Sequence, residues 1–354
     1  MSYIETIWKR HAYHQKSFLL SIICVPLSIV YRIASYLKRG FYERWTRKRI
    51  IVDDPVITIG NLTVGGSGKT PLTMYIVEHL QSLDFNCHVI SRAYGSNYDS
   101  QFAHYNGEWD TKGFFGDEVE SYISRIPNLL LSIGKQRGLL VKKYSKFVKH
   151  QVFILDDALQ YWRLIKDFQI ILVHGKYLFG NRNIFPNGPL RENEEELKRA
   201  AIVIVYSPQN SLEFYQKYLN VEQLFFARQK IVSFENQQGK STRISELKKK
   251  RCISVCSIAH PDSFIDSINS LEIELLKSFK FADHHSYTSE DQSIIENYMQ
   301  ENDIDYLLMT EKDSPKWKKP NNKILISRLN LIISESEKFD KILLDYIAQK
   351  MKNI

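Results

Sequence analysis

The stretch PVITIGNLTVGGSGKTP, residues 55–71, decides the fold of this chain. It opens with apolar, β-branched residues at 56–59 and continues through a glycine-rich turn. It ends in Lys69-Thr70, followed by a helix-compatible segment with Pro71 near its start. A strand, a glycine-rich turn, Lys-Thr and a helix, in that order, are typical of a loop whose backbone N–H groups surround the phosphates of a nucleotide. The sequence therefore predicts a nucleotide-binding α/β fold.

The loop supplies specific side chains as well as backbone. Lys69 is expected to place a mobile positive charge on the β- and γ-phosphates, and Thr70 to offer its hydroxyl to Mg²⁺. The usual pattern, G-x-x-x-x-G-K-[ST], has a glycine where this chain has Thr63, but the remaining glycines leave the backbone room to approach a phosphate. The residues predicted to bind ATP are Thr63, Val64, Gly65, Gly66, Ser67, Gly68, Lys69 and Thr70.

Short apolar runs alternate with helical or polar segments along the chain. This cadence predicts a mostly parallel sheet of the P-loop NTPase type, with helices on both faces. The predicted strands cover residues 88–91, 152–155, 170–173, 202–206, 253–255, 306–309 and 324–326. Because a polar interval interrupts the runs, we expect four parts: a membrane-associated N-terminal helical region (1–50), a P-loop domain (51–228), a linker region (229–250) and a smaller C-terminal α/β domain (251–354).

Positive charge is concentrated at the N-terminus. Residues 1–49 contain ten Lys or Arg and two acids, so their net charge equals the +8 of all 354 residues. The rest of the chain is neutral overall, which argues against a nucleic-acid-binding protein. The basic residues flank the apolar segment 18–31, which would rise about 21 Å as a helix, short of the roughly 30 Å hydrocarbon core.

We therefore expect the N-terminal helix to lie in the cytoplasmic leaflet of a membrane, with Lys and Arg on anionic lipid. Whether the helix spans the bilayer stays open at this point. An ordinary buried helix with a solvated basic face is the alternative interpretation.

Carboxylates and histidines provide candidates for the chemistry. Asp156 and Asp157 end an apolar run, where a carboxylate beside a phosphate loop organises Mg²⁺ directly or through water; which of the two contacts the metal stays open. Asp117, in Gly-Asp-Glu, is by itself more typical of a helix N-cap than of a base. The histidines of Asp283-His284-His285 could be metal ligands, core residues or half of a proton-transfer pair.

In combination, these segments resemble the bacterial tetraacyldisaccharide 4'-kinases of lipid A synthesis. The motifs that carry the resemblance run from the phosphate loop to about residue 315. They are GNLTVGGSGKTP (60–71), SRAYG (91–95), GDE (116–118), GKQRG (134–138), ILDDALQYWRL (154–164), FGNRNIFPNGPLRE (179–192), SIAHPDSF (257–264), FADHHSY (281–287) and TEKD (310–313).

The resemblance implies transfer of the ATP γ-phosphate to the 4'-hydroxyl of a tetraacylated glucosamine disaccharide 1-phosphate, giving lipid IVA, at the cytoplasmic face of the inner membrane. It implies no obligate protein partner. Asp117 would be the general base, and His284, preferred over His285, would support its charge. The remaining roles implied are metal binding for Thr70, Asp156, Asp157 and Glu192, and substrate binding for Tyr94, Arg137, Gln160 and Arg191.

Two other functions are compatible with a phosphate loop. A membrane-associated P-loop switch ATPase would hydrolyse ATP to act on a protein partner, and a structural scaffold would not need Lys69 or Asp117. A guanine-specific switch is disfavoured because Lys312 and Asp313 are adjacent, without the residue that usually separates them.

Overall fold

We analysed a computed structural model of the chain, which describes residues 3–14, 17–45, 49–65, 68–92, 96–98, 101–258, 261–282, 285–319 and 321–352. The chain forms two compact units. The larger contains Ser2–Arg228 and Ile332–Ile354, and the smaller contains Gln229–Leu331. The chain therefore passes between the units twice, within strands β10 (Leu224–Glu235) and β15 (Ile324–Ile333).

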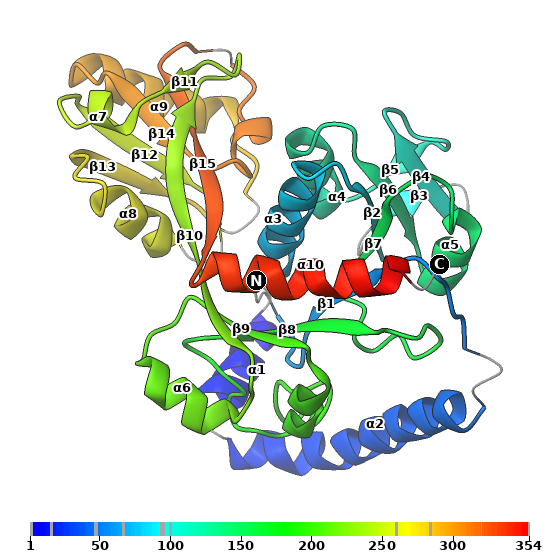
Figure 1. Ribbon diagram of the computed structural model, residues 1–354. Coiled ribbons are helices and arrows are strands. Elements are labelled where there is room, and N and C mark those ends of the chain that lie inside the picture. Colours follow the sequence, from blue (N-terminus) through cyan, green and yellow to red (C-terminus); the bar gives the residue numbers. More distant parts are fainter. Residues whose placement is uncertain are drawn as a thin grey trace. The chain divides into compact units, whose positions relative to one another are not determined.

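A mostly parallel sheet forms the centre of the larger unit (Figure 1), in the order β4-β6-β2-β7-β1-β8-β9-β10. Within this order of described strands, β4 runs antiparallel to β6 and the other neighbours pair in parallel. The strands are β1 (Val56–Asn61), β2 (Asn86–Ser91), β4 (Phe102–Asn106), β6 (Leu130–Gly134), β7 (Gln151–Asp156), β8 (Phe168–His174) and β9 (Ile202–Tyr206). A separate ribbon pairs β3 (Asn97–Tyr98) with β5 (Gly113–Phe114).

Strand β1 is buried along its whole length, between β7 and β8. A parallel strand covered on both faces reads as a continuous apolar run, which is why the sequence located β1, β2, β7, β8 and β9 to within about two residues. The predicted P-loop NTPase-type fold is confirmed. The helices of this unit are α1 (Tyr3–Tyr13), α2 (Phe18–Arg44), α3 (Lys69–Gln81), α4 (Asp117–Arg125), α5 (Arg137–Tyr144), α6 (Leu212–Leu219) and α10 (Ser336–Lys352), with a 3₁₀ helix, η2, at Glu194–Arg199.

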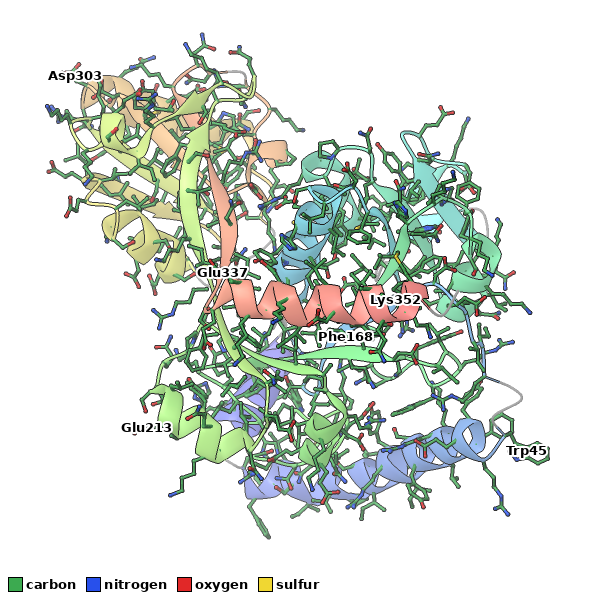
Figure 2. The ribbon with its side chains drawn as sticks, in the orientation of Figure 1. Trp45, Phe168, Glu213, Asp303, Glu337 and Lys352 are labelled. Carbon is green, nitrogen blue, oxygen red and sulfur yellow. The ribbon has the colours of Figure 1, made fainter. Side chains whose placement is uncertain are left out.

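Helix α10 belongs to the larger unit although it ends the described chain. In Figure 1 it is the red helix that lies across β1 and β8. The Tyr346 ring stacks on Phe168 at 4.7 Å between centroids, and the Tyr346 hydroxyl accepts a hydrogen bond from the Val56 N–H at 3.1 Å. Figure 2 labels Phe168, together with Glu337 and Lys352 near the two ends of α10. The helix thus covers the edge at which β1 begins.

The smaller unit is a second α/β layer with its own core. Strands β12, β13, β14 and β15 are parallel neighbours, and β11 pairs antiparallel with β10. Ile253, Leu307 and Ile324, from three adjacent strands, are fully buried together. The further elements are β11 (Ser241–Thr242), α7 (Ile244–Leu247), β12 (Cys252–Cys256), α8 (Pro261–Asn269), β13 (Leu275–Lys280), α9 (Ser289–Glu301), β14 (Tyr306–Met309) and η3 (Ser314–Lys316).

These units differ from the predicted division in two places. Residues 229–250, expected as a linker region, form part of β10, then β11 and α7, and Phe234 and Leu247 are fully buried in the core of the smaller unit. Residues 332–354, expected in the C-terminal domain, return to the larger unit. The reason in each case is a long-range apolar contact that the local polarity of the sequence does not reveal.

Helix α2 is longer than the apolar segment of the sequence, and most of its apolar side chains are exposed. It covers 27 residues, about 40 Å at 1.5 Å per residue, because the helix continues past Pro26 and through the basic residues to Arg44. An 18-residue window has mean hydropathy 2.0, yet only 6% of it is buried. By length and composition the helix is therefore long and apolar enough to cross a membrane, in contrast to the predicted 14-residue segment.

Candidate functional site

The phosphate loop joins β1 to α3 at the carboxyl edge of the sheet. Gly68 caps the N-terminus of α3 with φ +84°, a left-handed conformation that favours glycine. A side chain would also be blocked there, since a Cβ on Gly68 would lie 2.5 Å from the Tyr206 ring. The helix N-terminus and its free N–H groups are thus presented to the loop, as an anion site requires.

Thr63, which replaces the first glycine of the motif, has a structural explanation. It forms an antiparallel bridge with Leu190, and the neighbouring Val64 N–H donates to the Pro189 carbonyl at 2.7 Å. Thr63 has no positive φ, so its extended backbone accommodates a β-branched side chain. The loop is therefore fixed by pairing with residues 189–190 at the point where other phosphate loops rely on glycine.

Lys69 meets two partners at the start of α3. Its Nζ donates to the Asn61 Oδ1 at 3.3 Å and lies 3.8 Å from an Asp157 carboxylate oxygen. Asn61 is fully buried at the end of β1, and its amide nitrogen donates to the Gly65 carbonyl at 3.3 Å. Asn61 therefore connects the lysine to the turn of the loop, so the ammonium group is held beside the place where phosphates bind.

Asp156 and Asp157 lie beside the loop, because β7 pairs with β1 in parallel and places Asp156 opposite Ile59. The buried Asp156 accepts a hydrogen bond from the Tyr122 hydroxyl at 2.9 Å. Asp157 has φ +47°, which turns the chain immediately after the strand. Arg137 donates to the backbone carbonyls of both residues, at 2.9 and 2.7 Å. The arginine thus braces this turn through the main chain.

The Asp157 carboxylate is surrounded by positive charge. Arg191 donates to both of its oxygens, at 3.0 and 3.1 Å, and the Arg191 N–H donates to the Leu62 carbonyl. Burial by itself raises the pKa of Asp157, but the charges of Lys69 and Arg191 outweigh burial, so this pKa lies below its ordinary value. Asp157 is therefore an anion at neutral pH and available to a cation.

Glu192, the next residue after Arg191, contacts a different set of charges. Its Oε2 accepts from Arg199 at 3.1 Å, and Arg199 also pairs with Glu196. Burial, with a contribution from Glu196, raises the pKa of Glu192 despite the opposing charge of Arg199. Among the described residues no group of three or more His, Cys, Asp or Glu could hold a metal ion. Of the predicted metal ligands, Asp156 and Asp157 thus lie beside the loop, Thr70 is in the first turn of α3, and Glu192 is engaged with Arg199.

Gln160 lies near the loop, with its amide nitrogen 3.4 Å from the Asn61 carbonyl. Several predicted residues lie outside the described part of the chain: Gly66, Ser67, Tyr94 and His284, and the side chain of Asp117. Asp117 is the first residue of α4, preceded by the N-cap Gly116 with φ +91°. His285 is described: its Nε2 donates to an Asp291 carboxylate oxygen at 2.9 Å, and its ring stacks on Phe281.

The sequence reasoning did not single out Asn61 or Tyr13. Asn61 could have been found, because a polar residue that directly follows the apolar strand, inside the phosphate-loop motif, is expected to lie beside the loop. Tyr13 had none, because its contact spans 51 residues: its hydroxyl donates to the Val64 carbonyl at 2.7 Å. The Tyr13 ring is packed at 5.3 Å from that of Tyr177, and burial raises the pKa of Tyr13 to about 12. Tyr13 is therefore a neutral donor that fixes the phosphate loop from α1.

We expect Tyr13→Phe to raise the KM for ATP about fivefold with a smaller change in kcat, because a hydrogen bond of about 1 kcal/mol to the loop is lost. Steady-state kinetics at varied ATP check this. Tyr177→Phe is the matched control, since it removes a neighbouring hydroxyl and leaves the Val64 contact intact. An unchanged KM for ATP in Tyr13→Phe would show that α1 does not position the loop.

Comparison with known proteins places the chain among lipid kinases. A family model described as tetraacyldisaccharide-1-P 4'-kinase matches residues 20–348. A tetraacyldisaccharide 4'-kinase of Psychromonas ingrahamii is 29% identical over 83% of this chain and 85% of its own length. A tetraacyldisaccharide 4'-kinase of Bdellovibrio bacteriovorus is 29% identical over 88% of this chain and 94% of its own length.

A solved structure has the same fold. It is a crystal structure of an "apo" form of LpxK from Aquifex aeolicus in complex with ATP, with a TM-score of 0.70 and 24% sequence identity. The match covers 91% of this chain and 98% of the other.

Proposed function

Because the chain belongs to the tetraacyldisaccharide-1-P 4'-kinase family, we propose that its phosphate loop, paired aspartates and Asp117 divide the work of that reaction. The chain is an ATP-dependent kinase of lipid A biosynthesis that phosphorylates the 4'-hydroxyl of a tetraacylated glucosamine disaccharide 1-phosphate. The observation that carries the assignment of roles is the position of Lys69, held between Asn61 and Asp157 where β1 and β7 end.

In this proposal the 4'-hydroxyl oxygen attacks the γ-phosphorus, the bond from phosphorus to the β–γ bridging oxygen breaks, and ADP leaves. Asp117 accepts the hydroxyl proton, and His284 supports the charge on Asp117. Lys69 and the N–H groups at the start of α3 neutralise charge on the phosphates, which is the main requirement of phosphoryl transfer. The pairing of His285 with Asp291 favours His284 for this role, since His285 already serves the local fold.

The oxygen donors beside the loop fit Mg²⁺, which proteins usually bind through one or two carboxylates together with water and phosphate oxygens. We assign the Thr70 hydroxyl and the two aspartates to it. When bound, Mg²⁺ would neutralise charge on the phosphate oxygens. The side chain of Asp157 is 36% exposed and ionised, so it remains accessible while Lys69 and Arg191 balance its charge. Glu192 then acts indirectly, by holding Arg199.

Removal of divalent metal by a chelator is expected to abolish transfer, and added Mg²⁺ to restore it. Asp157→Asn should need about tenfold more Mg²⁺ for half of its maximal rate, because a ligand charge is lost. Asp167→Asn, which removes an exposed carboxylate paired with Lys350, is the matched control. An unchanged Mg²⁺ requirement in Asp157→Asn would exclude Asp157 from the metal site.

We also propose that α2 lies in the cytoplasmic leaflet of the inner membrane and does not span it. Ser28, near the middle of α2, donates to the Ile184 carbonyl at 2.9 Å and accepts from the Asn187 N–H at 2.9 Å. A spanning helix would carry residues 184–187 to the bilayer centre, where loop backbone is costly. The apolar residues of α2 that do not contact the unit are free to enter lipid. They include Phe18, Leu19, Ile23, Val30 and Leu37, each at least 64% exposed.

Replacing Leu19, Ile23 and Val30 together by glutamine is expected to move most of the protein from the membrane fraction to the supernatant, because three buried apolar contacts with lipid are lost. Fractionation without detergent measures this. The control replaces Ile51, Phe147 and Leu212, which are exposed apolar residues outside α2. If the two triple variants fractionate alike, α2 is not the anchor.

A further inference from the structure

A small cavity lies where the C-terminal part of α2 meets the loop after β7. Its volume is about 170 Å³, and it is lined by Lys38, Tyr42, Gln136, Tyr161, Trp162 and Arg163. The cavity therefore has room for a phosphate group together with a few water molecules. We propose that it binds a phosphate group carried by a lipid. This proposal rests on the attachment of α2 to the membrane.

Two cations line the cavity without a carboxylate partner. Neither Lys38 nor Arg163 forms an ion pair with any residue that the structure describes, whereas other cations nearby are neutralised. Arg39 pairs with Glu43 and Glu196, and Arg199 pairs with Glu192 and Glu196. The local acids are thus engaged elsewhere, and two positive charges remain for an anion that enters.

The cavity walls orient these charges. The Arg163 guanidinium donates to the Gln136 side-chain oxygen at 3.2 Å, which fixes one edge of its planar fork and leaves the other donors available. The Trp162 ring, which forms another wall, is held by Arg39, Arg199 and Lys166 at 4.5 to 5.0 Å from its centroid. A guanidinium fork matches phosphate oxygens in pairs, and a lysine adds a mobile charge, so the lining is suited to phosphate.

The position of the cavity indicates that the phosphate arrives on a lipid. Lys38 and Tyr42 lie one turn apart on α2, next to exposed Tyr36, Leu37, Phe41 and Trp45. Figure 2 shows Trp45 projecting beyond the end of α2. Aromatic and basic residues in this arrangement are typical of headgroup depth. Two lipids offer the same chemistry: an anionic phospholipid of the bilayer, and the substrate through its 1-phosphate.

The test compares Lys38→Gln/Arg163→Gln with Arg32→Gln/Lys142→Gln, which removes two exposed cations outside the cavity. One arm measures sedimentation with vesicles of equal parts phosphatidylglycerol and phosphatidylcholine. The other arm measures the KM for tetraacyl disaccharide 1-phosphate in detergent micelles. Each cation near an anionic surface contributes about fivefold to affinity. We therefore expect the cavity variant to lose about thirtyfold in affinity in one of the two arms, and the control variant to lose fivefold or less in both arms.

Loss of vesicle binding with an unchanged KM identifies the bilayer phospholipid, and a raised KM with vesicle binding like that of the control identifies the substrate phosphate. Equal behaviour of the two pairs in both arms overturns the proposal. Lys38→Gln alone should lower the affinity about fivefold in the same arm. Because Lys38 is exposed, this single variant should fold normally and so guards against misfolding of the double variant. If the wild-type protein binds vesicles but transfers no phosphate, the kinase assignment fails while the vesicle arm still tests the cavity.

Discussion

Lys69→Ala is expected to lower kcat/KM for phosphoryl transfer by about a thousandfold. Its ammonium group is held at 3.3 Å from Asn61 and 3.8 Å from Asp157, beside the N-terminus of α3. Positioned charges of this kind contribute about 10²- to 10³-fold each, since they act where negative charge develops. Most of the loss should come from kcat, with a smaller rise in the KM for ATP.

The Lys69 variant should remain folded, because Asp157 keeps its ion pair with Arg191 and the loop keeps its contacts with residues 189–190. Thermal unfolding of the variant beside the wild type checks this. Lys142→Ala, an exposed lysine on α5, is the matched control and should retain full activity. A Lys69→Ala enzyme that is folded and within tenfold of the wild type would refute the role of this loop in transfer.

Asp117→Asn is expected to lower kcat about a thousandfold while leaving the KM for both substrates close to that of the wild type. A general base contributes about 10²- to 10⁴-fold, and the amide keeps the size of the side chain but accepts no proton. Loss confined to kcat indicates an interaction made only in the transition state.

Glu120→Gln is the control for Asp117, since Glu120 is an exposed acid on the same short helix, α4. It should show wild-type kinetics. An Asp117→Asn enzyme that loses activity through KM alone would assign Asp117 to binding and leave the base unidentified.

The sequence predicted the part of the fold that depends on local pattern. Strands β1 and β7 are apolar runs ended by the phosphate loop and by two aspartates, and their parallel pairing brings Lys69 to Asp157. A motif of this kind encodes its own geometry within a few residues, so the ATP site follows from it.

Long-range packing was not predictable in the same way. Helix α10 returns to the larger unit through Tyr346, which contacts Val56 across 290 positions. The pairing of Arg191 with Asp157, and the reach of Tyr13 to Val64, depend on which loops the fold brings together. The length of α2 was underestimated because basic residues ended the apolar run while the helix continued. None of these contacts leaves a periodic signal in the sequence.

The most direct test of the central claim is transfer of label from γ-labelled ATP in detergent. We predict that the purified protein labels the tetraacyl disaccharide 1-phosphate in the presence of Mg²⁺, and that Asp117→Asn and Lys69→Ala lose most of this label. Label that appears only as free phosphate, whether or not the lipid is present, would contradict transfer to the lipid and favour a P-loop switch ATPase.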